Sequence, residues 1–340
     1  MDTQLMEKTA RAMVAPGKGL LAADESAGTC KKRFDSIGVE STEQTRRAYR
    51  EMLFTTPKLS DYVSGVILFD ETLRQSTKDG VNFAKYLEGN GIIPGIKVDA
   101  GAHDMALHPG EKVTEGLDSL ASRMKEYFGM GARFAKWRAV ITIGKGIPTQ
   151  ACLDANAHAL ARYSAICQEA SIVPIVEPEV LLDGDHTAGT SEEVHLRTLE
   201  TLFHELATQD VLLEHVILKA SMVVSGNKDA KQAGVREVAE RTVRVLKRTV
   251  PAALPGVVFL SGGQSDENAT AHLDAMNRMG GLAWPLTFSY SRALQHMALT
   301  TWRGKNENVG AAQKALAHRA RMNSLAARGQ WSAEAEKQAA

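Results

Sequence analysis

A lysine interrupts the stretch EHVILKASMVV, residues 214–224, directly after three aliphatic residues. The aliphatic run is typical of a strand that is buried on both faces of a parallel sheet. An isolated buried charge costs several kcal/mol unless it is paired or neutralised. Lys219 therefore either marks the exposed end of a strand or carries out chemistry.

Polar residues also end most of the other short apolar segments. These ends carry Asp24, Asp70, Lys97 with Asp99, Lys136 with Arg138, Glu177 with Glu179, Ser261 and Ser289. Because side chains alternate along a strand, Lys136 and Arg138 share one face, as do Glu177 and Glu179. Charge pairs that recur on successive strand ends favour one shared functional site over simple exits into loops.

Eight apolar segments recur along the chain, and most of the stretches between them have helical periodicity. The segments begin at Gly19, Val63, Ile92, Arg133, Ile172, His215, Val257 and Leu282. Strands that alternate with helices indicate a parallel sheet. Eight repeats in 340 residues predict an α/β fold, a single-domain (β/α)8 TIM barrel over residues 1–340, with an Ala-rich tail from about 303.

Two of the helical stretches have sequences that fit a capping box at their start. In residues 41–54 the pair is Ser41 with Gln44, and in residues 190–209 it is Thr190 with Glu193. Such pairs satisfy the free N–H groups of the first turn. We therefore expect helices to begin at these positions.

The composition limits the classes of partner. Forty basic residues balance forty acidic ones, so no global charge favours nucleic acid or a membrane surface. Three cysteines, Cys30, Cys152 and Cys167, are too few for a disulfide framework and fit a reducing compartment. The start of the sequence resembles neither a signal peptide nor a transit peptide, and no apolar run reaches membrane-spanning length. We expect a soluble, cytoplasmic protein.

The strand ends predict a pocket that attracts an anion, because cationic candidates outnumber carboxylates. The cations are Lys97, Lys136, Arg138, Lys219 and Arg292, and the carboxylates are Asp24, Glu177 and Glu179. The turn LSGGQS offers the backbone N–H groups of Gly262 and Gly263 to a phosphate. Ser289 and Arg292 follow the next strand, which matches the usual phosphate position after strands seven and eight of a barrel.

A second phosphate group could bind at the other end of the substrate. Lys97 supplies a positive charge there, and Ser26 and Thr29 in DESAGT supply hydroxyl groups. Together the two sets predict a substrate with two anionic ends.

Lys219 then has a chemical explanation. A lysine becomes a nucleophile only after losing its proton, which burial and the neighbouring Lys136 favour. Attack on a ketone gives an imine, whose electron withdrawal lets an adjacent carbon–carbon bond break and leave an enamine. Glu177 is placed to shuttle protons, and Asp24 can take the proton of the hydroxyl whose carbon becomes the aldehyde. This scheme requires no metal ion and no other cofactor.

Seven segments together resemble the class I fructose-bisphosphate aldolases, the Schiff-base type, over nearly the whole chain. They are GKGLLAADESAGT, GIKVD, FAKWR, VEPE, ILKASM, LSGGQS and SYSRALQ. The resemblance implies that Lys219 forms the Schiff base, that Glu177 is the main acid/base and that Asp24 assists bond cleavage. It also implies that Lys136 and Glu179 orient and tune that machinery.

The resemblance further divides the substrate-binding residues between two phosphates. For the phosphate nearer the ketone it implies Ser261, Gly262 and Arg292. For the other phosphate it implies Lys97, Arg138, Ser26 and Thr29. It also implies a homo-oligomer, usually a tetramer, that acts on sugar phosphates in glycolysis and gluconeogenesis.

The chain departs from that pattern at two places. Ser291 stands where the best-known animal members have a glycine, so we expect one backbone contact to the phosphate to differ. The chain ends in EAEKQAA, without their terminal tyrosine. We therefore expect proton exchange at the enamine carbon to be slower or to use Glu177 alone.

Three other hypotheses remain compatible with parts of the pattern. Another imine-forming barrel, such as a transaldolase or a sugar-acid aldolase, should lack one of the two phosphate sets. A metal-dependent enzyme would use His103, Asp104 and His108, which occupy a loop without i, i+4 spacing and are interpreted as surface residues. A non-catalytic protein on this fold should lack Lys219 or Glu177.

Overall fold

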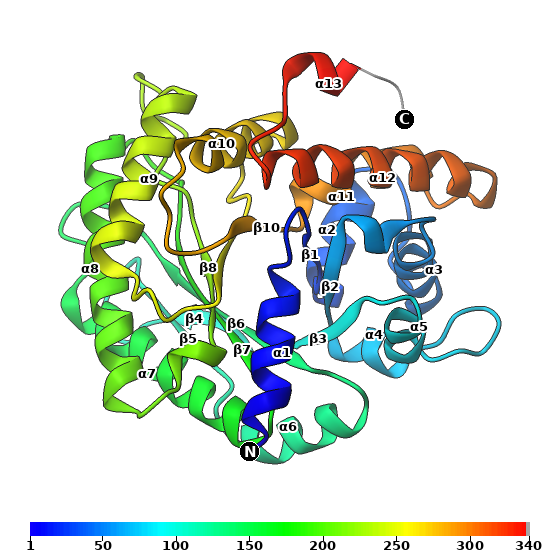
Figure 1. The fold of residues 1–340 in the computed structure, drawn as a ribbon, viewed down its shortest axis with the longest axis horizontal. Coiled ribbons are helices and arrows are strands. Elements are labelled where there is room, and N and C mark those ends of the chain that lie inside the picture. Colours follow the sequence, from blue (N-terminus) through cyan, green and yellow to red (C-terminus); the bar gives the residue numbers. More distant parts are fainter. Residues whose placement is uncertain (338–340) are drawn as a thin grey trace.

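In the computed structural model, which describes residues 1–337, eight parallel strands close into a barrel (Figure 1). In chain order they are β1 (Gly19–Ala23), β2 (Val63–Leu68), β3 (Ile93–Lys97), β6 (Phe134–Ile141), β7 (Val173–Val180), β8 (Ile217–Ala220), β9 (Gly256–Phe259) and β10 (Leu286–Tyr290). The register of β10 against β1, with Leu20 opposite Ser289, completes the ring. Each strand falls in or overlaps one of the eight apolar segments, so the predicted (β/α)8 barrel is confirmed.

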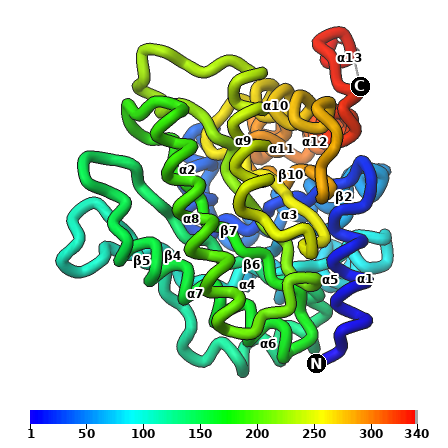
Figure 2. The backbone as a smooth tube through the Cα atoms, turned by 60° about the vertical axis from the view of Figure 1, so that its left-hand side comes forward, coloured from blue at the N-terminus to red at the C-terminus, as the bar shows by residue number. Residues whose placement is uncertain are grey.

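Helices surround the barrel and connect its strands (Figures 1 and 2). They are α1 (Thr3–Met13), α2 (Ala27–Asp35), α3 (Glu43–Phe54), α4 (Asp70–Arg74), α5 (Phe83–Gly89), α6 (Leu120–Gly129), α7 (Gln150–Glu169), α8 (Ala188–Thr208), α9 (Val235–Thr249), α10 (Asp266–Met279), α11 (Arg292–Trp302), α12 (Val309–Ala326) and α13 (Ala333–Lys337). Single 3-10 turns occupy Leu59–Asp61, Leu213–His215 and Asn306–Asn308. Within residues 1–337, no helix has the combination of length and apolar character needed to cross a membrane.

The predicted start of α3 is wrong by one residue. Thr42 is the N-cap, and its hydroxyl accepts from the backbone N–H of Thr45 at 3.1 Å. The Thr45 hydroxyl in turn accepts from the Thr42 N–H at 2.8 Å, so the capping box is Thr42 with Thr45 rather than Ser41 with Gln44. Ser41 and Thr42 both carry a hydroxyl, and only the path of the incoming chain decides which one caps.

The predicted start of α8 is also wrong, because the helix begins before Thr190. Thr187 is the N-cap, and its hydroxyl accepts from the Thr190 N–H at 3.2 Å. The sequence pattern starting at Thr190 therefore lies inside the first turn. Gly189 lies between Thr187 and Thr190. Because glycine disfavours a helix interior, helix propensity does not indicate this earlier start.

Helix α1 seals the amino-terminal end of the barrel. Its side chains Met6, Ala10 and Met13 are fully buried and pack in one cluster with residues from the strands, among them Phe134 and Ile217. Figure 1 shows this helix, in blue, crossing the strands. Because apolar side chains fill this end, an open polar site can form only at the carboxyl ends of the strands.

Along the chain, β3 and β6 are separated by a hairpin of β4 (Gly101–Asp104) and β5 (Lys112–Glu115). The hairpin projects at the left edge in Figure 2. His103 and Asp104 are therefore on a strand rather than in a loop, and both are exposed. Asp104 forms an ion pair with Lys112. Across residues 1–337, no group of three or more histidine, cysteine, aspartate or glutamate side chains is arranged to hold a metal ion.

The Ala-rich segment after residue 303 packs on the barrel helices as α12 and α13. Small residues such as Ala312 and Ala320 let α12 lie close to its neighbours, and both are fully buried. The hydroxyl of Thr270 on α10 donates to Asn323 on α12 at 2.7 Å. Glu336 on α13 pairs with Arg319 and accepts from the Trp331 indole N–H at 2.9 Å. These contacts hold the segment against α10.

Gly95 on β3 provides a test of packing between neighbouring strands. A Cβ atom at this position would lie 2.2 Å from the ring of Phe134, which is itself fully buried. We expect Gly95→Ala to lower the free energy of unfolding by about 1–3 kcal/mol in urea denaturation, because the buried ring has little room to move. Gly89→Ala is the matched control, since a Cβ there meets nothing within 4 Å. Equal effects of the two changes would contradict this account of the contact.

Candidate active site

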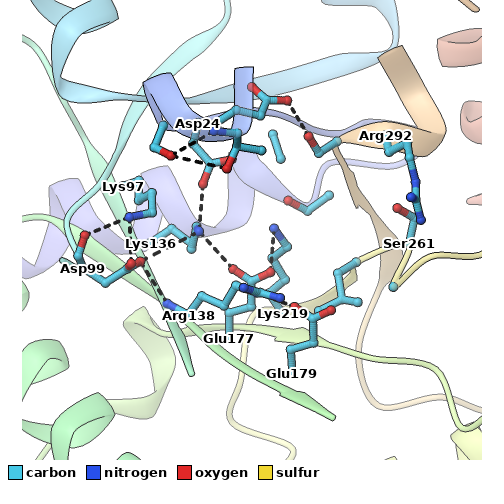
Figure 3. Close-up of a pocket in the computed structure, with 18 of the residues that line it drawn as sticks. Asp24, Lys97, Asp99, Lys136, Arg138, Glu177, Glu179, Lys219, Ser261 and Arg292 are labelled. Carbon is cyan, nitrogen blue, oxygen red and sulfur yellow. Dashed lines mark hydrogen bonds and ion pairs between the residues drawn. The ribbon is translucent and has the colours of Figure 1, made fainter. Parts of the chain in front are cut away.

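A pocket of about 640 Å³ opens at the carboxyl ends of the strands. Every residue that the sequence analysis assigned to the site lines it: Asp24, Ser26, Thr29, Lys97, Lys136, Arg138, Glu177, Glu179, Lys219, Ser261, Gly262, Gly263, Ser289 and Arg292. Parallel strands end at the same rim, so residues that are far apart in sequence converge there (Figure 3).

Glu177 lies between two buried lysines. Its Oε1 atom is 3.0 Å from the Nζ of Lys219, and its Oε2 atom is 3.3 Å from the Nζ of Lys136. All three side chains are at most 5% exposed. Because one carboxylate contacts both amino groups, it can exchange a proton with Lys219 while Lys136 holds it in place.

Lys136 is held as an ammonium ion by several carboxylates. Its Nζ lies 2.7 Å from Asp24 and 4.0 Å from Asp99, in addition to its contact with Glu177. Burial by itself lowers the pKa of Lys136, but Asp24, Glu177 and Asp99 outweigh it and raise the pKa well above its ordinary value. Lys136 is therefore suited to electrostatic support and unsuited to nucleophilic attack.

Asp24 is held as a carboxylate by the same contacts. Burial favours its protonated form, but the charges of Lys136 and Lys219 dominate and hold the pKa of Asp24 well below its usual range. Its carboxylate is therefore available as a proton acceptor across the neutral pH range.

Asp99 organises the side of the pocket next to the β4–β5 hairpin. Its carboxylate lies 2.7 Å from the Nζ of Lys97 and accepts from the backbone N–H groups of Arg138 and Gly101, each at 3.2 Å. The sequence analysis noted Asp99 at a strand end but left it out of the site. The signal was present, because Lys97 and Asp99 are two residues apart, like the other same-face pairs.

Arg138 extends from this side of the pocket toward solvent. It forms an ion pair with Glu179, which comes from the neighbouring strand β7. Burial lowers the pKa of Arg138, but Glu179 outweighs it, so the pKa is raised and the guanidinium stays charged. Glu179 thus orients a rim cation.

Ser26 and Thr29 stand at the start of α2, beside this cationic group. Ser26 is the N-cap, and its hydroxyl lies 3.4 Å from the Thr29 N–H and 3.3 Å from the Thr29 hydroxyl. Both residues line the pocket, as does Lys97. A helix N-terminus with two hydroxyl groups and a nearby lysine is suited to an anion.

A glycine turn and Arg292 form the opposite side of the pocket. Gly262 and Gly263 have φ angles of 53° and 93°, which residues other than glycine adopt only with strain. A Cβ atom on Gly263 would lie 3.2 Å from an Nη2 atom of Arg292, so the turn's backbone lies directly against this guanidinium. Figure 3 shows Ser261 and Arg292 on one side of the central lysines and Lys97 and Asp99 on the other.

Ser289 is a second polar group at this side. Its hydroxyl is buried and has no hydrogen-bond partner among the residues that the structure describes. It lies next to the last residue of β10 and lines the pocket, so it is free to bind a substrate oxygen.

Glu25, Arg33 and Ser291 also line the pocket, and the sequence analysis did not assign them to it. The hydroxyl of Ser291 donates to Glu25 at 2.7 Å and accepts from Arg33 at 3.0 Å. Buried Arg50 holds the other oxygen of Glu25 at 2.6 Å. Glu25 follows Asp24 at a strand end and could have been found there, whereas Arg33 lies on a helix with no comparable signal.

Comparison with known proteins finds relatives over most of the chain. The chain matches the family described as "Glycolytic: Fructose-bisphosphate aldolase class-I" over residues 5–340. It is 60% identical over 332 residues to "Probable fructose-bisphosphate aldolase class 1" of Xanthomonas campestris, with 97% of this chain and 99% of that protein covered. It is 53% identical over 328 residues to "Fructose-bisphosphate aldolase 1" of Toxoplasma gondii, with 96% and 90% covered.

The structure also matches a solved fructose-bisphosphate aldolase of Plasmodium falciparum, crystallised with TRAP and a small-molecule inhibitor. The TM-score is 0.96 at 49% identity, with 97% of this chain and 95% of that chain covered. The fold and the matches define a barrel enzyme of the lyase class that works through a lysine imine. More particularly, the chain belongs to the class I fructose-bisphosphate aldolase family, which confirms the resemblance found in the sequence.

The depressed pKa of Asp24 gives a pH dependence of stability. A carboxyl group that has a lower pKa in the folded protein stabilises it above the unfolded pKa, and this contribution is lost as pH falls. We expect the difference in unfolding free energy between wild type and Asp24→Asn to be constant above about pH 5 and to shrink below the ordinary carboxyl pKa of 3.8. Urea unfolding from pH 3.5 to 7 measures it.

The control is Asp61→Asn, because Asp61 is exposed on a 3-10 turn outside the pocket. Its difference from wild type should not vary in the same way. If the Asp24→Asn difference stayed constant down to the lowest pH, the carboxylate would not be stabilised by the lysines.

Proposed function

We propose that the protein catalyses the reversible aldol cleavage of fructose 1,6-bisphosphate to dihydroxyacetone phosphate and glyceraldehyde 3-phosphate. The observation that carries this proposal is the position of Glu177, in contact with Lys219 and Lys136 at the centre of a pocket with cationic groups at both sides. A metal-dependent mechanism is not needed, because the protonated imine serves as the electron sink.

Imine formation begins with loss of a proton from Lys219 to Glu177, its neighbour at 3.0 Å. The free amine attacks the ketone carbon, and Glu177 returns the proton to the former carbonyl oxygen. Glu177 then carries a second proton from the nitrogen to that oxygen, which leaves as water and gives the positively charged imine. The same carboxyl group serves both steps because it reaches Lys219 without rearrangement.

Bond cleavage uses Asp24 as the base. It takes the proton of the hydroxyl on the carbon that becomes the aldehyde, and the electrons of the adjacent carbon–carbon bond move into the imine to give an enamine. Asp24 lies on the other side of Lys136 from Glu177, so one fixed ammonium orients both carboxylates. Protonation of the enamine and hydrolysis of the imine then release dihydroxyacetone phosphate.

The two cationic sides of the pocket account for a bisphosphate. Ser261, Gly262, Gly263 and Arg292, supported by Ser289, are the proposed contacts of the phosphate nearer the ketone. The other phosphate is assigned to Lys97, Arg138, Ser26 and Thr29. Alternative imine enzymes that act on substrates with one anion have no need of the second set.

The cellular role is inferred from the family and from the names of relatives. We infer a cytoplasmic enzyme of glycolysis and gluconeogenesis that assembles as a homotetramer, with no nucleic-acid or membrane partner. Support comes from "Fructose-bisphosphate aldolase 4, cytosolic" of Arabidopsis thaliana, 51% identical over 322 residues, although a chloroplastic protein of that plant is 50% identical.

Lys219→Met tests the identity of the nucleophile. Methionine fills a similar volume, and Glu177 retains Lys136 as its cation, so we expect a folded protein with no measurable cleavage. Borohydride reduction in the presence of dihydroxyacetone phosphate should label wild type at Lys219 and leave the variant unlabelled, as read by mass spectrometry of the peptides. Labelling of the variant would identify another lysine as the nucleophile.

Arg292→Ala and Arg138→Ala test the two phosphate sites. A lost charge-assisted pair should raise the KM of the affected substrate about tenfold or more. We expect Arg292→Ala to weaken fructose 1,6-bisphosphate, fructose 1-phosphate and dihydroxyacetone phosphate, since each carries the phosphate nearer the ketone. Arg138→Ala should spare dihydroxyacetone phosphate and reduce the preference for the bisphosphate over fructose 1-phosphate. Equal losses on all three ligands in both variants would indicate one general cationic field.

A further inference from the structure

The glycine turn that lies against Arg292 depends on one carbonyl oxygen. The backbone N–H of Gln264 donates to the Ser261 carbonyl at 3.0 Å and closes the turn around Gly262 and Gly263. Both glycines have positive φ angles, 53° and 93°, within the turn that this bond closes. The direction of their N–H groups therefore depends on what holds the two ends of the turn.

The side chain of Gln264 closes the same turn a second time. Its Nε2 atom donates to the Ser261 carbonyl at 3.1 Å and lies 3.6 Å from the sulfur of Met222. Both neighbours are acceptors, which places the amide nitrogen on this side and the amide oxygen on the other. An amide rotated by half a turn would direct its oxygen at the Ser261 carbonyl and lose this bond.

His272 determines that orientation of the amide. Its Nδ1 atom lies 2.5 Å from the Oε1 of Gln264, and its side chain is buried. Burial lowers the pKa of His272 to about 4, so the ring is neutral near pH 7. Because Oε1 can only accept, the neutral ring must carry its proton on Nδ1.

Helix α10, which carries His272, is anchored to a neighbouring helix. The helix starts directly after the turn, with Ser265 as its N-cap. Two residues before His272, fully buried Thr270 donates to Asn323 of α12 at 2.7 Å and accepts from Arg319 at 3.2 Å. The histidine therefore connects the turn to a part of the barrel wall that is itself anchored.

We propose that His272 is a positioning residue which, through Gln264, holds the Ser261–Gly263 turn in the shape that binds the phosphate nearer the ketone. The inference rests on the proposed function. The His272 side chain does not contact the substrate, but it sets the affinity for one phosphate and leaves the imine chemistry at Lys219 unaffected.

The test compares two ketones that differ by a phosphate group. Imine formation is measured by borohydride trapping across a range of dihydroxyacetone phosphate and of dihydroxyacetone, for wild type, His272→Phe and His272→Asn. We expect His272→Phe to raise the half-saturating concentration of dihydroxyacetone phosphate about threefold to tenfold, the worth of one hydrogen bond, and to leave dihydroxyacetone unchanged. His272→Asn should restore most of the affinity, because an amide can donate to Gln264.

The matched control is His195→Phe. His195 is also a buried helical histidine, with its Nδ1 2.7 Å from the Ser191 carbonyl, but it lies on α8 and contacts no residue of the turn. Thermal unfolding of each variant measures its stability. If His272→Phe fails to fold, Gln264→Glu replaces it, since glutamate lacks the Nε2 donor to Ser261, and the same selective loss is expected.

The outcomes separate this inference from the proposed function. Unchanged trapping of dihydroxyacetone phosphate in folded His272→Phe, or an equal loss for both ketones, would overturn the inference. The same selective loss of affinity for dihydroxyacetone phosphate in His195→Phe would overturn the inference as well. If wild type trapped neither ketone, the proposed function itself would fail.

Discussion

The whole site depends on one carboxylate that is shared by two buried lysine side chains. Glu177 contacts Lys219 through one oxygen and Lys136 through the other, in a part of the barrel where none of the three is more than 5% exposed. Breaking such a contact on one side leaves a buried charge without its partner, which is costly. The strands that carry these residues are consequently held in one register, and the chemistry requires that same register.

Charge is distributed from the centre of the pocket outward. At the centre, Asp24, Asp99 and Glu177 surround Lys136, so the cation is compensated and serves to hold carboxylates in place. Toward the rim, Arg138 is paired with Glu179 at one side, and Arg292 lies against the glycine turn at the other. This arrangement separates the requirement for proton transfer, which needs fixed carboxylates, from the requirement for binding, which needs available positive charge.

The barrel supports the residues for proton transfer and the residues for phosphate binding in different ways. Residues on the strands or directly after them supply the acid, base and nucleophile, because paired strands are rigid and place side chains with little freedom. The proposed phosphate contacts have separate supports: Asp99 pairs with Lys97 at the end of β3 and accepts from the start of the β4–β5 hairpin, whereas Gln264 closes the glycine turn. Ser291 similarly joins Glu25 to Arg33.

Much of this was present in the sequence, because strand alternation and parallel strand ends are local properties. Spacings of two residues placed Lys136 with Arg138 and Glu177 with Glu179, and the eight apolar segments predicted the barrel that brings them together. The exact N-caps of α3 and α8 could not be read in this way, since several hydroxyl residues compete at each helix start.

Only the tertiary structure decided the long-range partners. Ser291 and Glu25 are 266 residues apart and meet because β10 closes on β1. The contact of His272 with Gln264 spans only eight residues, but it depends on how the glycine turn meets the start of α10, which no periodicity specifies. The sequence by itself thus determined the fold class and the chemical groups of the site, because repeating patterns encode them. Which carboxylate neutralises which lysine depended on barrel closure, since electrostatic pairing is set by distance in space and not by separation along the chain.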